Sequence, residues 1–491
     1  MQRNYLLYSL SILAIFLGSF FLYSSLFYAL LNSDNAVTVL MVHYFKIPAD
    51  LYFWGQDRLG SLIPLIAQIP NKILGLSPLL SESLVHYGIL LAGFLAFSTF
   101  IRSQFYKVIF ALIWFFPPMR LIDVTQFAFG IHYSLIAIIC YLIHKLTNEE
   151  KALNNLRYYI ILTIATLLMI ITIWVSDMAI VSAGILIGIN FYFFFKNKSS
   201  QEKRNKISFA LFTIIGGITG YIVIHYAKSL TGIQNTYSTF GDLEMIRKSS
   251  EIFLKTIKEF LTFSSDEPLT NIYTYLVLIL IGSIAFSLKY FNLNRQTKKW
   301  LVYFLLESIL LFGIIMISKW TFLNSVPRRY FTCTYITLSF AMILILDNLE
   351  LNKRRSIYFK ILTLITVLVG GSSTIYNIKY FAPSSLIPMS TVLSDFEKLG
   401  RIGVISEYWN SYVTSCINPE LIKATPHDQT YAVRNYKIVE EVFQQPNIYI
   451  IRDMWMDSFP DTMRQFDRTL VKAGDQVKLG DCFVCRYEIV P

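Results

Sequence analysis

Two carboxylates stand out in residues 32–64, the stretch that follows the first long apolar run. Asp34 lies directly after that run, and Asp57 lies in Gly-Gln-Asp-Arg-Leu-Gly at residues 55–60. A carboxylate held just above a bilayer can act as a general base or as a metal ligand. For Asp34 the alternative is structural. Ser33 or Asp34 could cap a following helix, because its side-chain oxygen can accept hydrogen bonds from first-turn N–H groups.

The loop around Asp57 combines glycine backbone with aromatic and polar side chains. Its glycines allow the backbone to approach a ligand closely, and Gln56 and Arg58 are candidate substrate-binding residues beside the carboxylate. The alternative for Asp57 is an ion pair with Arg58, which contributes little at a surface. The ring of Trp54 could stack on the apolar face of a sugar, or it could be an ordinary aromatic residue of the membrane interface.

Further candidate site residues lie near the ends of predicted membrane helices. Polar groups at membrane depth are costly, so their placement is informative. Arg328 and Arg329 are adjacent, and the planar donor fork of arginine suits phosphate oxygens. The pair could hold the phosphate of a lipid carrier, or it could bind ordinary phospholipid headgroups. The other substrate-binding candidates are Asp123, His132, Asp177 and Lys319. For each of the first three, the alternative is a buried hydrogen-bonded group or a helix cap.

The composition indicates a polytopic membrane protein. Of 491 residues, 54% are hydrophobic and 15% charged, whereas a soluble protein carries about a quarter charged residues. Many runs reach the roughly 20 apolar residues that span a bilayer. The net charge of +11 is explained by basic cytoplasmic loops, so no nucleic-acid partner is expected; membrane lipids are.

The five cysteines show no metal-binding spacing. Cys482 and Cys485 form a CxxC, but they lie in an alternating, strand-like segment that would point them to opposite faces. The sequence therefore predicts no metal site and indicates no cofactor, although it does not exclude a divalent metal ion. Whether these two and Cys416 form a disulfide stays open.

About eleven helices are predicted to span the membrane. The first is expected to be retained, because its run is too long for a cleaved signal peptide. The predicted spans are 5–31, 83–101, 107–117, 127–144, 158–175, 178–195, 207–227, 271–288, 300–318, 331–346 and 357–376.

The distribution of lysine and arginine predicts the orientation. If the N-terminus is cytoplasmic, every inner loop is basic, as the positive-inside rule requires. The first outer loop, 32–82, and the long segment 229–270 then lie outside. We expect a multi-pass protein of the plasma (inner) membrane, with residues 1–376 forming the membrane domain and 377–491 an extracytoplasmic domain.

Two regions outside the spans have recognisable patterns. Apolar residues recur with a helical period over 242–260, which predicts an amphipathic helix on the membrane surface. The last hundred or so residues lose the long apolar runs and predict a small α/β domain with its own core. The expected elements are strands at 401–406 and 447–451, helices at 407–416 and 436–444, and a hairpin of 477–479 with 483–490.

This arrangement resembles the GT-C superfamily of membrane glycosyltransferases. It is most similar to bacterial members related to the protein O-mannosyltransferases and to the aminoarabinose transferase of lipid A. The residues that carry the resemblance are Ser-Asp-Asn-Ala at 33–36, Tyr-Phe-Trp-Gly-Gln-Asp-Arg-Leu-Gly-Ser at 52–61 and Glu-Tyr-Trp-Asn at 407–410. Many relatives have two adjacent acids in the first motif. This chain has Asn35 at the second position, so a paired-carboxylate role does not transfer.

The resemblance implies a GT-C-like, all-α membrane domain followed by the external α/β domain. It also implies sugar transfer from a polyprenyl-phosphate-linked donor to an envelope glycan such as O-antigen, a lipid or a protein. Asp34 would take the acceptor proton, and Arg328 or Arg329 would stabilise the departing lipid phosphate. The alternatives are an O-antigen polymerase or ligase, whose essential outer loop usually comes late in the chain, and a lipid-linked sugar flippase or transporter, which should carry charges near mid-membrane. Glu307 is the exception to a general scarcity of such charges.

Overall fold

The computed structural model describes residues 2–121, 128–148, 155–195, 200–231, 239–291, 293–381, 386–430 and 432–490. Its contacts divide the chain into two compact units. The helical unit comprises Met1–Ser19, Gly88–Tyr226 and Gln234–Phe381. The α/β unit comprises Phe20–Tyr87, Ala227–Ile233 and Ala382–Pro491, so it combines the first predicted outer loop with the C-terminal region.

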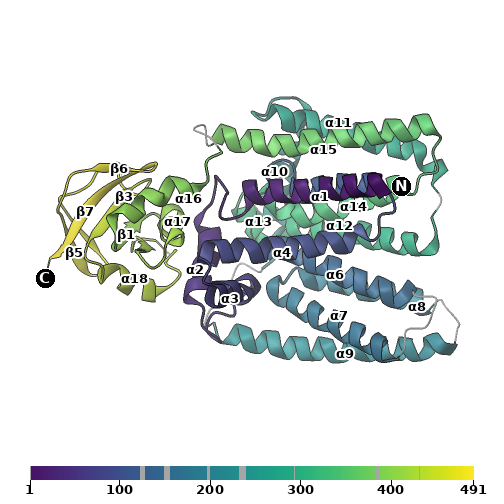
Figure 1. Cartoon of the computed structure of the whole chain (residues 1–491), viewed down its shortest axis with the longest axis horizontal. Coiled ribbons are helices and arrows are strands. Elements are labelled where there is room, and N and C mark those ends of the chain that lie inside the picture. Colours follow the sequence, from purple (N-terminus) through teal and green to yellow (C-terminus); the bar gives the residue numbers. More distant parts are fainter. Residues whose placement is uncertain are drawn as a thin grey trace. The chain divides into compact units, whose positions relative to one another are not determined.

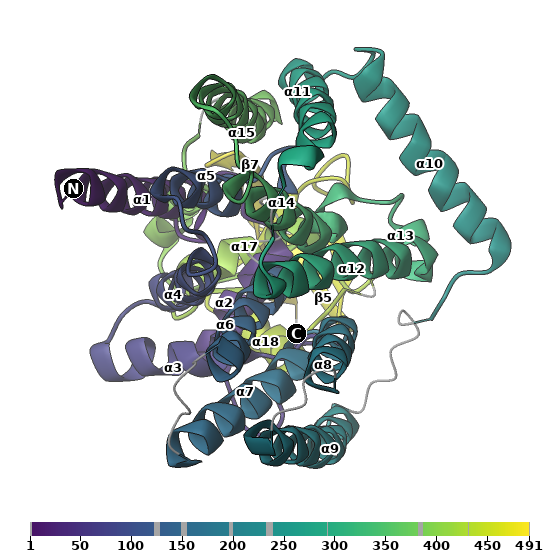
Figure 2. The ribbon, with the colours of Figure 1, turned by 90° about the vertical axis from the view of Figure 1, so that its right-hand side faces the viewer.

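The helical unit is built from helices, most of them apolar (Figure 2). They are α5 (Gln104–Phe115), α6 (Ala128–Asn148), α7 (Asn155–Val175), α8 (Ala179–Phe195), α9 (Ser200–Ser229), α10 (Leu243–Leu261), α11 (Pro268–Ser287), α12 (Arg295–Ile317), α13 (Lys319–Leu323), α14 (Thr332–Asp347) and α15 (Lys353–Phe381), with parts of α1 (Gln2–Tyr23) and α4 (Pro78–Ser98). In the described part of the chain, eight helices are long and apolar enough to cross a membrane.

The predicted multi-pass architecture is confirmed. The eleven predicted spans fall on the eight long helices and on three shorter apolar helices, α5, α6 and α8. Several boundaries differ by a few residues, and the largest difference is at the end of the first helix. The first helix ends at Tyr23 rather than near Leu31, and beyond its end the N–H of Leu26 donates a 3.0 Å hydrogen bond to the Ser83 hydroxyl.

Aromatic side chains form the centre of the helical unit. Phe97 of α4 stacks on Phe340 of α14 with ring centroids 4.6 Å apart, and it meets Phe304 of α12 edge-to-face at 5.1 Å. Phe110 and Trp114 of α5 complete this buried cluster. By contrast, α1 and α9 carry rows of exposed leucine, isoleucine and tyrosine side chains, as expected for helices that face lipid.

The helix α10 is the predicted amphipathic segment, and it contacts α11, α12 and α13 at the margin of the helical unit (Figure 2). Its start is fixed by Asp242, whose carboxylate accepts the N–H of Met245 at 2.8 Å. Opposite charges one turn apart, such as Glu244 with Lys248, line its polar face.

The α/β unit contains a seven-stranded mixed sheet (Figure 1). Its strands are β1 (Ile402–Ser406), β2 (Ile422–Pro426), β3 (Ile448–Arg452), β4 (Thr462–Gln465), β5 (Arg468–Lys472), β6 (Val477–Leu479) and β7 (Cys482–Val490). The order is β2-β1-β3-β7-β5-β4, and β6 pairs with β7. Only β1 pairs in parallel, with β2 and β3. Parallel neighbours require crossover connections, and α17 (Tyr408–Ile417) and α18 (Tyr436–Phe443) supply them.

The predicted fold class, a helical membrane domain with a C-terminal α/β domain, is confirmed. The predicted strands, helices and hairpin of the C-terminal region are all present. Sequence patterns missed β2 and the β4–β5 hairpin. That hairpin turns at Phe466 and Asp467, both with positive φ, and such turns are normally signalled by Asn-Gly or Asp-Gly.

The spacing of Ala36, Leu40, Tyr44 and Ile47 predicts a helix that lies on the membrane surface after the first span. The helix α2 (Ser33–Tyr44) is present, but its surroundings differ from that prediction. Residues 35–42 are all buried within the α/β unit, where α2 contacts α17 and α3 (Leu62–Leu74). It is thus enclosed by protein instead of resting an apolar face on lipid. Its start is capped by Asn32, which accepts the N–H of Asn35 at 3.2 Å. The cap is therefore neither Ser33 nor Asp34.

The close approach of α4 and α6 leads to a stability prediction. A Cβ on Gly93 would lie 2.6 Å from the Cα of Ser134, whereas a Cβ on Gly88 of the same helix would meet nothing within 4 Å. We expect Gly93→Ala to destabilise the protein by about 1–3 kcal/mol, because the helices must separate. The melting temperature of the detergent-solubilised protein measures this. Gly88→Ala is the matched control, and equal melting temperatures for the two variants would contradict the packing.

Candidate functional site

The carboxylate of Asp34 lies where α2 and α17 meet, inside the α/β unit. The hydroxyl of Tyr408 donates a 2.6 Å hydrogen bond to Asp34 Oδ1. The adjacent Ser33 hydroxyl donates to the carbonyl oxygen of Tyr408. The first turn of α2 is thus joined to the first turn of α17. Asp34 is partly exposed, and Tyr408 holds its carboxylate through Oδ1.

Tyr408 is suited to orient this carboxylate. Its side chain is buried, and burial together with the Asp34 charge raises the pKa of the phenol far above its usual range. The hydroxyl therefore stays protonated and donates at any physiological pH. A hydrogen bond to a charged acceptor is stronger than a neutral one. The sequence pattern at Glu407–Asn410 did not indicate a role for these residues. In the structure, Tyr408 of this stretch holds the Asp34 carboxylate.

Arg434 completes this cluster. Its guanidinium carbon lies 5.2 Å from the centroid of the Tyr408 ring, a cation–π geometry. On its other side it meets Gly55, where an added Cβ would lie 2.9 Å from Arg434 Nη1. Gly55 also has φ +74, a backbone conformation that favours glycine. The loop predicted to bind substrate therefore packs against an arginine that the sequence did not single out.

The loop itself is ordered by local hydrogen bonds. Trp54 Nε1 donates to Asp50 Oδ1 at 2.8 Å, and the indole is only 6% exposed. Little of the Trp54 ring is therefore available for stacking on a sugar. Arg58 Nε donates to Gln56 Oε1 at 3.1 Å. Asp57 Oδ1 is buried and has no hydrogen-bond partner in the described residues, which leaves it able to accept a hydrogen bond from a ligand.

The far end of α2 is fixed by a second polar group. The Tyr44 hydroxyl donates to Glu441 Oε2 at 2.6 Å and accepts from Lys423 Nζ at 2.8 Å. Lys423 and Lys437 each lie 3.3 Å from the Glu441 carboxylate. Burial raises the pKa of Glu441, but the Tyr44 hydrogen bond and the Lys423 charge outweigh it, so the net pKa is lowered. Both ends of α2 are thereby tied to the C-terminal domain.

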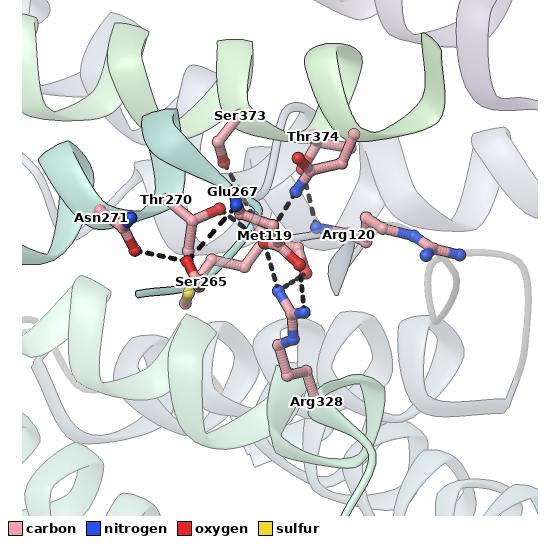
Figure 3. Close-up of polar contacts among 10 residues, drawn as sticks. Met119, Arg120, Ser265, Glu267, Thr270, Asn271, Arg328, Ser373 and Thr374 are labelled. Carbon is pink, nitrogen blue, oxygen red and sulfur yellow. Dashed lines mark hydrogen bonds and ion pairs between the residues drawn. The ribbon is translucent and has the colours of Figure 1, made fainter. Parts of the chain in front are cut away.

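In the helical unit, Arg328 is engaged by Glu267 (Figure 3). Arg328 Nη1 donates to Glu267 Oε2 at 2.7 Å, and Nη2 donates to Oε1, so the pair is bidentate. Thr270 and Asn377 donate to the same carboxylate at 2.8 and 2.9 Å. Figure 3 also shows the guanidinium of Arg120 pointing away from this group.

Glu267 is held in its charged form by these contacts. Burial raises the pKa of its carboxyl, but the hydrogen bonds and charge of Arg328, with Thr270 and Asn377, outweigh burial and lower it overall. The pair connects the start of α11, the segment before α14 and the helix α15. Arg328, predicted to bind phosphate, therefore already has a carboxylate partner in this structure.

The remaining predicted site residues of the helical unit are dispersed. Arg329 lies in the same turn as Arg328 (η4, Arg328–Phe331), with its guanidinium 5.7 Å from the Tyr330 ring. Lys319 begins α13. Asp177 lies in the turn between α7 and α8. His132 is buried, and its Nε2 lies 3.1 Å from the Ser182 hydroxyl. This environment agrees with the alternative of a buried hydrogen-bonded group. Asp123 lies outside the described residues.

Two ionisable groups of α12 are buried among the helices. Lys299, expected in a basic inner loop, is instead 3% exposed and donates to Asn190 Oδ1 at 2.7 Å. Glu307 is 2% exposed, and its Oε2 has no hydrogen-bond partner in the described residues. No group of three or more His, Cys, Asp or Glu residues in the described part of the chain could hold a metal ion. All five cysteines are free.

The described residues thus combine long apolar helices, a helical first loop and a C-terminal α/β domain. The first loop presents its carboxylate at the start of a short helix. The expected fold is therefore present.

The comparisons specify that fold further. Two crystal structures of ArnT from Cupriavidus metallidurans, one in the apo state and one bound to undecaprenyl phosphate, each match with a TM-score of 0.57 at 8% identity, over 99% of this chain and 98% of theirs. The apo oligosaccharyltransferase of Archaeoglobus fulgidus is a weaker likeness, with a TM-score of 0.47 at 11% identity over 91% and 69% of the two chains. No protein-family model matches the sequence, and no curated protein matches it significantly.

The Glu267–Arg328 pair predicts a pH-dependent contribution to stability. The pKa of Glu267 is lowered in the folded protein. Its stabilisation is therefore fully present above the unfolded value of about 4.3 and is lost as the pH falls through the folded value. We expect Glu267→Gln to lower the melting temperature by several degrees at neutral pH and to have little effect in strong acid. Thermal unfolding of the solubilised protein across this pH range tests it.

Glu259→Gln is the matched control, because Glu259 forms an exposed pair with Lys255 at 3.9 Å. We expect no pH-dependent loss in that variant. A Glu267→Gln effect of equal size at neutral and acidic pH would show that packing, and not charge, is what matters at this site.

Proposed function

We propose that this chain is an integral-membrane glycosyltransferase that moves a sugar from a polyprenyl-phosphate-linked donor to an acceptor hydroxyl at the outer face of the membrane. The observation that carries the proposal is the partly exposed Asp34 carboxylate, held by Tyr408 at the start of α2. The fold supports it, because ArnT matches nearly the whole chain and one ArnT structure is bound to undecaprenyl phosphate.

Asp34 is proposed as the general base. The acceptor hydroxyl gives its proton to Asp34 while its oxygen bonds to the anomeric carbon of the donor sugar. The bond between that carbon and the lipid phosphate oxygen breaks at the same time, and the phosphate leaves with the electron pair. This direct displacement inverts the anomeric centre. Tyr408 engages Oδ1 and so fixes the orientation of the carboxylate, which leaves Oδ2 to receive the proton.

Cationic side chains would stabilise the charge that develops on the leaving phosphate. Arg329 and Lys319 remain the candidates for direct contact. Arg328 is bound by Glu267, and we assign it the role of fixing the turn from which Arg329 projects. Asp57, with its unpartnered Oδ1, is proposed to bind a sugar hydroxyl. The proposal includes no metal or other cofactor.

Substitution of Asp34 tests the base. We expect Asp34→Asn to abolish transfer, because the amide cannot accept the proton, and Tyr408→Phe to reduce it by about tenfold or more through loss of a charge-assisted hydrogen bond. The measurement is the mass of envelope glycans and lipids in cells that lack the protein and in cells that express each variant. The mass difference also names the sugar and the acceptor.

Asp242→Asn is the matched control, since Asp242 only caps α10 and asparagine caps helices equally well. Full transfer by Asp34→Asn would reject the base assignment. The second candidate function, a lipid-linked sugar transporter, is favoured by the buried Lys299 and Glu307 of α12. It predicts the opposite pattern, in which Glu307→Gln removes activity and Asp34→Asn does not.

The proposed site requires the α/β unit to lie outside the cell membrane. We therefore expect a reporter enzyme fused after Pro491 to be active only on the extracytoplasmic side, and one fused within the loop of residues 350–352 to be active only in the cytoplasm. Paired fusions of alkaline phosphatase and a cytoplasmic reporter measure this. Cytoplasmic activity of the C-terminal fusion would overturn the orientation derived from the positive-inside rule.

A further inference from the structure

Three polar residues follow the carboxyl ends of the three parallel strands. Glu407 comes directly after β1, His427 directly after β2, and Asp453 directly after β3. In the sheet order β2-β1-β3, β1 lies between the two others. The chain passes from β1 to β2 on one side, and then crosses over to form β3 on the other side of β1. In open α/β sheets, ligands bind outside the carboxyl ends of strands where the strand order reverses in this way.

The polar groups at this edge are held together by hydrogen bonds. Asp453 Oδ2 accepts from Asn410 Nδ2 at 2.9 Å and from the N–H of Glu407 at 3.2 Å. The His427 ring stacks on Trp455, with centroids 4.4 Å apart and planes within 5°. The edge therefore offers two carboxyl groups, an amide and an imidazole next to a planar aromatic wall.

Two buried polar atoms at this edge lack partners among the described residues. His427 is 8% exposed, and its Nδ1 is buried without a hydrogen bond. Asp453 Oδ1 is also buried without a hydrogen-bond partner among the described residues. Leaving such an atom unsatisfied costs about 1–3 kcal/mol, so this edge gains stability when a ligand supplies hydrogen-bonding groups: a donor to Asp453 Oδ1, and a donor or an acceptor to His427 Nδ1 according to its tautomer. Burial also raises the pKa of Asp453 and, with the nearby Asp453 charge, that of Glu407.

The chemistry of the edge selects the ligand class. Two carboxyl groups repel an anion, and the described residues include no group of three side chains that could hold a metal ion. Acceptor atoms that surround a planar aromatic wall suit a ring that carries several hydroxyl groups and has one apolar face. A saccharide has these properties.

We propose that Glu407, Asn410, His427, Asp453 and Trp455 form a saccharide-binding site in the α/β unit, and, resting on the proposed transferase function, that it holds the acceptor glycan. Glu407 immediately precedes Tyr408, whose hydroxyl is bound to Asp34. A sugar bound at the sheet edge therefore occupies the segment that also orients the proposed base. The α/β unit would then recognise the acceptor in addition to supporting α2.

The test is saturation-transfer NMR on the full-length protein in detergent, with neutral methyl hexopyranosides and with oligosaccharides released from the envelope polysaccharide of the same cells. We expect saturation transfer to at least one saccharide. Asp453→Asn and Glu407→Gln should weaken that binding at least about tenfold, because each removes a charged acceptor. Both changes preserve side-chain size, and unchanged melting temperatures show that the variants are folded.

Asp467→Asn, at an exposed turn of the same sheet, is the matched control and should bind normally. Absence of saccharide binding, equal binding by all variants, or competition by methylamine or Ca²⁺ but not by saccharides would overturn the site. The Asp34→Asn variant separates the two proposals. If it retains transferase activity while the Asp453 and Glu407 variants lose binding, the base assignment fails and the saccharide site stands.

Discussion

The hydrogen bond between the Tyr408 hydroxyl and Asp34 is the contact on which the proposed chemistry depends, because it fixes the carboxylate of α2 to the C-terminal domain. The cluster of Tyr44, Lys423 and Glu441 fixes the other end of the same helix. A 12-residue helix alone would be marginal in water. Here α2 is enclosed by α17 and α3, so its position is set by tertiary packing. This gives the carboxylate a defined orientation on an otherwise short element.

The cost of burying charge explains where polar side chains lie elsewhere. Arg328 near the end of a span is compensated by a bidentate carboxylate, and that carboxylate is in turn bound by Thr270 and Asn377. Lys299 finds an amide oxygen inside the helical unit. Single charges at such depth persist only when hydrogen bonds compensate them. Glu307 Oε2 has no such bond among the described residues, so compensation at this carboxyl group is incomplete.

Much of the fold could be predicted because its determinants are local. Long apolar runs predict the spans, and the apolar periods of 436–444 and 447–451 predict α18 and β3. The candidate site was harder to predict from the sequence. Asp34 was singled out by its position after the first span, whereas its partner Tyr408 lies more than 370 residues away and no local pattern connects the two. For Arg328 the sequence singled out the arginine but did not indicate that Glu267 would bind it.

The discontinuity of the α/β unit has a consequence for biosynthesis. Its helix α2 is made early, while α17, which encloses it, emerges only after every predicted span has been translated. During that interval Ala36, Val39 and Leu40, all fully buried in the finished protein, lack the cover that α17 supplies, although α3 is already made. Contacts so distant in sequence form slowly and expose apolar surface meanwhile. A ribosome that stops before α17 therefore leaves a chain in which Tyr408 is missing and the orientation of the proposed base is not fixed.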